Sequence, residues 1–171
     1  MLADTGSQLQ RLEERQKSAL SRLSRTVSLL DNLCELTSSA PIKAISRLSR
    51  GIVAYADSLG TQEDAFFRLL ENTDAIIHAI IEIYLSEPET LVRDAAPLPR
   101  FIQTLQKLHR FFELELERKV RQGRFKRFIK RGFLVPNNSA LLRDCQEELD
   151  QALAEFKISH TGTARLDFAA F

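Results

Sequence analysis

The sequence predicts an all-α protein: an up-and-down four-helix bundle with an extra N-terminal amphipathic helix and a short helix before the last long helix. Apolar residues recur at intervals of three and four along several long stretches, which is the period of an amphipathic helix. The five prolines lie at the edges of these stretches rather than inside them. With 171 residues, 44% hydrophobic and 27% charged, the chain has the size and composition of one globular domain.

Residues 1–40 are expected to form an N-terminal amphipathic segment, with one helix over residues 7–37. Its apolar stripe is narrow, like the seam of a coiled coil, and includes Leu12, Leu23 and Leu30. This spacing fits three arrangements. The stripe packs on the core of its own domain, it mediates self-association by pairing with a second copy, or the helix is mobile and docks reversibly on the bundle.

Residues 41–158 are expected to form the four-helix bundle. Ser39 and Pro41 are suited to the start of its first helix, and Gly60 to its end. Gly51 within that helix weakens it unless a neighbouring element packs closely there.

The next helix is expected to open at Thr61 and to carry the broadest apolar face of the chain, centred on Ile77. After a polar connection over residues 86–99, the following helix starts near Phe101 and ends at Gly123. A short helix over residues 124–131 and a closing helix through Phe156 complete the bundle. Residues 159–171 are expected to form a flexible C-terminal tail.

The stretch from Arg118 to Phe133 holds eight Lys and Arg and no Asp or Glu, in a chain whose net charge is only +1. Such a segment can meet an anionic surface such as lipid headgroups or a nucleic acid. It is equally consistent with charges that stay in water while the apolar residues pack inward. The candidate membrane- or anion-binding residues are Lys119, Arg121, Arg124, Lys126, Arg127, Lys130 and Arg131; Phe125, Phe128 and Ile129 are candidates for insertion.

No sequence pattern indicates an enzyme, a cofactor or a metal site. The chain lacks HExxH, GxxxxGK[ST], GxSxG and GxGxxG, and neither His78 nor His109 follows a Glu by three residues. Cys34 and Cys145 lie far apart in the sequence and do not have the spacing of a metal or redox site. They are expected to be free thiols in a reducing compartment. The N-terminus does not resemble a signal peptide, and the most apolar run is too short to span a bilayer. The expected location is cytoplasmic, with conditional recruitment to a membrane.

From Pro41 to Phe156 the layout resembles the N-terminal four-helix bundle of mixed-lineage kinase domain-like protein and the HeLo-type domains of fungal NLR-like cell-death proteins. The similar segments are PIKAISRLSRGIVAYADSL, EDAFFRLLENTDAIIHAIIEIYL, FIQTLQKLHRFFELELERKV with the GRFKRFIKRG that follows it, and LLRDCQEELDQALAEF. The resemblance implies a cell-death or innate-immunity bundle that self-associates and engages anionic membranes. In that family the bundle usually precedes a sensor NTPase or a kinase-type domain, so such a protein is an implied partner.

Two other functions remain open from the sequence. A protein–protein adaptor or scaffold would use the basic stretch against an acidic partner and would have no membrane activity. Nucleic-acid binding through the same stretch is disfavoured by the balanced overall charge and by the lack of a recognised reader motif.

Overall fold

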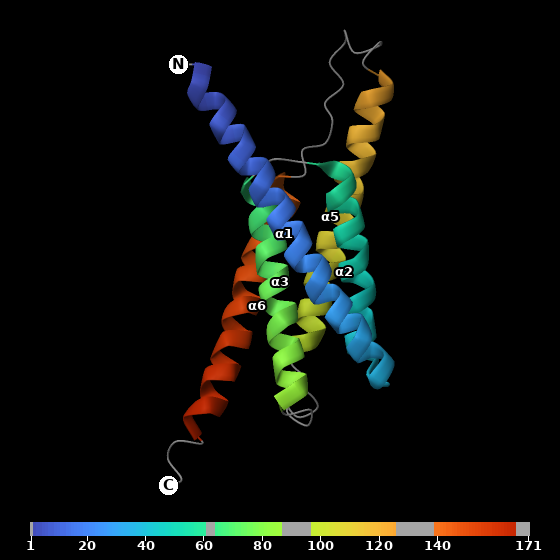
Figure 1. Cartoon of the computed structure of the whole chain (residues 1–171). Helices are drawn as coiled ribbons and strands as arrows, with labels where there is room; N and C mark the ends of the chain where they lie inside the picture. The colour runs from blue at the N-terminus through green and yellow to red at the C-terminus, as the bar shows by residue number, and fades with distance from the viewer. Residues whose placement is uncertain (1, 61–63, 87–96, 126–138, 167–171) are drawn as a thin grey trace.

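The computed structural model describes residues 2–60, 64–86, 97–125 and 139–166, and all of its regular structure is helical (Figure 1). The helices are α1 (Leu2–Leu36), α2 (Ala40–Leu59), α3 (Asp64–Ser86), α5 (Pro97–Phe125) and α6 (Ser139–Leu166). Successive helices run in alternating directions, and the two chain ends lie at opposite ends of the bundle (Figure 1). The predicted all-α bundle is confirmed.

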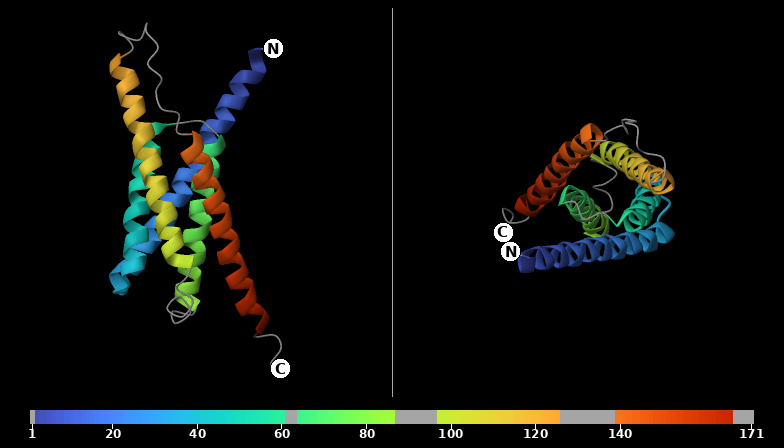
Figure 2. Two further views of the ribbon diagram at one scale, coloured as in Figure 1. Left: turned by 180° about the vertical axis from the view of Figure 1, so that it is seen from behind. Right: turned by 90° about the horizontal axis from the view of Figure 1, so that it is seen from above.

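The helices close into a ring in the order α1, α2, α5, α6, α3, and α3 packs back on α1 (Figure 2). Three of these neighbouring pairs are parallel. Gly51 and Leu59 of α2 meet His109 and Lys119 of α5 in the same order, for example. The helices α2 and α3 are consecutive in the chain, yet within the described residues they do not pack directly on each other.

The core is a single apolar cluster to which all five helices contribute. Ile77 of α3 is fully buried in this cluster, as the sequence predicts. Phe66 of α3 packs on Phe111 and Phe112 of α5, with ring centroids 5.4 and 5.5 Å apart. The helix α1, from the expected N-terminal segment of residues 1–40, supplies part of the same core as the helices of residues 41–158.

Two local features of α2 follow the sequence. Gly60 has a positive φ of 55°, and its N–H donates to the carbonyl of Ala56, which ends the helix. At Gly51, an added Cβ would lie 2.5 Å from Nε2 of His109, so this glycine lets α5 approach closely. Pro41 lies in the first turn, as expected, whereas the side chain of Ser39 occupies the N-cap position without making a capping hydrogen bond.

Four expected boundaries differ from the structure. The helix α1, expected over residues 7–37, begins at Leu2. The helix α5 begins at Pro97, inside the expected connection, and continues through Gly123 to Phe125. A single glycine costs a helix only about 1 kcal/mol, so Gly123 does not have to end it. The helix α6 runs on to Leu166, which corrects the expected tail over residues 159–166. The opening residue Thr61, residues 126–131 of the expected short helix and residues 167–171 lie outside the described residues.

Candidate functional site

The last residues of α5, in the basic stretch, extend beyond the ends of α2 and α6, its neighbours in the ring (Figure 1). Only two of the seven candidate anion-binding side chains, Lys119 and Arg121, are described, and both are exposed. Arg124 lies in the described helical backbone. Lys126, Arg127, Lys130 and Arg131 lie outside the described residues, so their part in an anion-binding surface stays a prediction.

Lys119 has a specific contact with α2. Its ammonium donates to the backbone carbonyls of Ser58, at 3.3 Å, and Leu59, which are the last two residues of that helix. These carbonyls have no partner within an α-helix and carry its negative dipole end, so a cation there is stabilising. Lys119 therefore caps α2 and is less free to bind an anion than the other members of the stretch.

The turn beyond Lys119 is open to solvent. Val120, Arg121, Gln122 and Gly123 are all exposed, and Val120 is 48% exposed despite its apolar side chain. One turn earlier, Arg118 pairs with the buried Glu115 at 2.7 Å, which ties that cation to its own helix. The cationic surface thus begins at Arg121.

Of the three candidate insertion residues, Phe125 is the last residue of α5. Phe128 and Ile129 lie outside the described residues, and the side chain of Phe125 is not described either. Their role in insertion stays a prediction.

The three leucines expected to mediate self-association are placed differently. Leu23 and Leu30 are 0% exposed and belong to the core of the chain itself, whereas Leu12 is half-buried. Leu23 and Leu30 therefore pack on the core of their own domain, which is the first of the arrangements expected for the α1 stripe. In this fold neither leucine is on the surface where a second copy could reach it.

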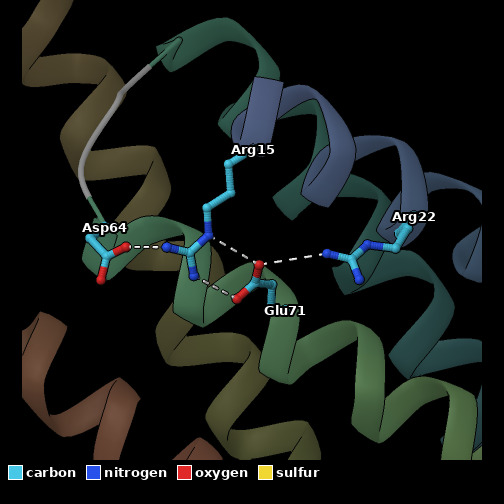
Figure 3. Close-up of polar contacts among 4 residues, drawn as sticks. All are labelled: Arg15, Arg22, Asp64 and Glu71. Carbon is cyan, nitrogen blue, oxygen red and sulfur yellow. Dashed lines mark hydrogen bonds and ion pairs between the residues drawn. The ribbon is translucent and has the colours of Figure 1, made fainter. Parts of the chain in front are cut away.

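A cluster of charges holds the upper part of α1 to α3 (Figure 3). The guanidinium of Arg15 donates to both carboxylate oxygens of Glu71, at 3.1 and 3.4 Å, and to Asp64. Arg22 lies 3.6 Å from the same Glu71. The hydrogen bond to Glu71 is the main cause that raises the pKa of Arg15 above its usual value. The sequence gives no signal for this cluster, because its members lie on helices far apart in the chain.

On its other side, α1 meets α2 at Asp31, which accepts a hydrogen bond from Ser46 and lies 3.8 Å from Arg50. Above this contact the two helices leave an open groove of about 620 Å³ between them. Leu20, Val27 and Val53 contribute its apolar surface. No sequence pattern indicates this groove, since it depends on how α1 crosses α2.

Of the two thiols, Cys145 is buried inside the bundle and Cys34 is half-buried. Burial raises the pKa of Cys145 to about 11 and also raises the pKa of Cys34 above its usual value. A thiol of raised pKa is a poor nucleophile and a poor metal ligand at neutral pH. Within the described ranges, no three His, Cys, Asp or Glu side chains gather as a metal site would need.

None of the helices described here combines the length and apolarity that crossing a membrane requires. No family model, no curated protein and no solved structure matches the chain. The candidate site is therefore defined by its own geometry: it is an exposed basic helix end on an all-α bundle.

Proposed function

We propose that this chain is a non-enzymatic helical-bundle module that is recruited to anionic membranes through the basic end of α5 and acts as an assembly of copies. The observation that carries the proposal is the projecting end of α5, where Val120, Arg121, Gln122 and Gly123 are exposed together. The resemblance to cell-death bundles suggests the same kind of role, in cell death or innate immunity.

The attraction would be electrostatic and additive. Each Lys or Arg close to an anionic bilayer contributes about 1 kcal/mol, and at physiological salt the field of the lipid extends about 8–10 Å from the surface. Because Lys119 is already bonded to α2, the contribution would come from Arg121 and the cations that follow it in the sequence. The position of the helix end supports this, since α5 projects past the end of α2 at the end of the bundle where α1 also projects (Figure 1).

The test is sedimentation with vesicles of phosphatidylcholine containing phosphatidylserine, over a series of salt concentrations. The wild-type chain should bind and should dissociate as salt rises. Reversal of Arg124, Lys126, Arg127 and Lys130 to Glu should abolish binding while leaving the helical circular dichroism spectrum unchanged.

A matched control reverses four exposed cations elsewhere on the bundle, Arg25, Lys43, Arg47 and Arg68, and so changes the net charge equally. This control should keep most of the binding. If both variants lose binding equally, net charge rather than the end of α5 is responsible. If the first variant binds as well as wild type, the membrane proposal is wrong and the adaptor function takes its place.

A further inference from the structure

The groove between α1 and α2 is shallow and open, and three serines lie on its α1 side. On α1 the exposed residues that line it include Ser21, Ser24 and Ser28, at helical intervals of three and four. Val53 and Ala54 form part of the α2 bank. Small side chains on a helix surface let another helix approach closely, but they do not by themselves indicate which one.

The charges at the ends of the groove do indicate a partner. Because α1 and α2 are antiparallel, Lys17 of α1 and Asp57 of α2 line one end, whereas Asp31 of α1 and Arg50 of α2 line the other (Figure 1). Lys17 and Asp57 form no ion pair within the part of the chain that the structure describes, and Arg50 lies 3.8 Å from Asp31. Each of the two helices thus contributes one cation and one anion to the groove, and the order of the two charges along the groove is opposite on α1 and α2.

This diagonal pattern is complementary to itself. A two-fold axis parallel to the helices, placed over the groove, would set α1 of one copy against α2 of the other while keeping the same ends together. Lys17 would then face the partner's Asp57, and Arg50 would face the partner's Asp31. A two-fold interface needs this property, because the same patch is used on both subunits.

From this arrangement we infer that the α1–α2 face is the surface through which two copies of the chain associate. The serines of one α1 would pack over Val53 and Ala54 of the partner subunit. The inference deepens the self-association half of the proposed function and moves it from the buried Leu23 and Leu30 to an outer face. This association does not depend on lipid, so the inference and the proposed membrane binding can fail separately.

The experiment is sedimentation velocity of the full chain at low salt, from micromolar to millimolar concentration. The wild-type chain should pass from one-chain to two-chain mass as concentration rises, and added salt should weaken the association. Lys17→Glu and Asp57→Lys should each weaken it roughly tenfold, since the two-fold axis makes each change act twice.

The double variant Lys17→Glu with Asp57→Lys should restore the wild-type association, because it exchanges the two charges. A double variant as weak as the single ones, or a wild-type chain that is monomeric throughout, would overturn the inference.

A steric pair completes the test. Ser24→Trp fills the groove and should leave the chain monomeric, whereas Ser18→Trp, on an exposed residue of α1 outside the groove, should not. Equal association of the two tryptophan variants would place the interface elsewhere. Vesicle sedimentation of the Ser24→Trp variant separates this inference from lipid binding: a monomer that still binds anionic vesicles leaves the basic end of α5 in its proposed role.

Discussion

Between Ala19 and Leu33, α1 buries five apolar side chains in the core, whereas between Val120 and Gly123 every side chain of α5 is exposed. Both segments lie in long amphipathic helices that extend past the same end of the bundle (Figure 2). The difference shows that the apolar stripe of a helix and its charged residues have different roles in this chain. A continuous apolar stripe is covered by the nearest helices of its own chain, while concentrated charge remains in water, where another molecule can reach it.

Magnitudes support this contrast. Burying a Leu or Val side chain contributes about 1.5–3 kcal/mol, so the five buried residues of α1 contribute on the order of 10 kcal/mol. Exposed ion pairs such as those of Arg22 with Glu71 contribute about 0.2–1 kcal/mol each. Apolar packing therefore holds α1 in the ring, and the charge cluster mainly sets how α1 lies against α3.

The largest expected effect is that of removing α1. Deletion of residues 1–37 would uncover the faces of α2 and α3 that α1 covers, at a cost comparable to the whole stability of a domain of this size. The truncated chain should lose cooperative thermal unfolding and should bind a dye specific for exposed apolar surface. Deletion of residues 1–11 alone should leave the melting curve close to wild type. A sharp, unshifted transition after the longer deletion would contradict the placement of α1 in the core.

A second comparison lies within α1. Leu23→Ala removes a fully buried side chain and should lower the free energy of unfolding by about 2–5 kcal/mol. Leu29→Ala, on the same helix but 52% exposed, should change it by less than about 0.5 kcal/mol. Urea denaturation of both variants measures the difference, and equal losses would mean that the buried face of α1 has been misassigned.

The smallest effect separates two cations at the end of α5. Lys119→Met removes the contact with the last carbonyls of α2 and should lower stability by about 0.3–1 kcal/mol. Arg121→Met, two residues further on and exposed, should leave stability unchanged but weaken vesicle binding. Thermal melts and vesicle sedimentation of both variants test this division. A stability loss for Arg121→Met equal to that for Lys119→Met would remove the distinction between a capping lysine and an anion-binding arginine.

The sequence by itself determined the features that depend on neighbouring residues. The helical period, the buried face around Ile77 and the end of α2 at Gly60 follow from spacing and from the properties of glycine. At Gly51 the sequence left two outcomes open, a weakened helix or a closely packed neighbour, and the structure shows the neighbour, α5. The basic stretch was equally visible, because a local excess of charge needs no partner to be recognised. The cations of this stretch are the part of the candidate site that could be predicted from the sequence.

Only the tertiary structure decided which helices meet. Periodicity shows that one side of α1 is buried but does not show what buries it, so packing in the chain's own core and pairing with a second copy both remained compatible with Leu23 and Leu30. The contact of Lys119 with Leu59, the charge cluster at Arg15 and the groove from Lys17 to Asp57 join residues that are tens of positions apart. They exist because the helices close into a ring in which α2 lies beside α5 and α3 beside α1, an order that no local pattern of residues encodes.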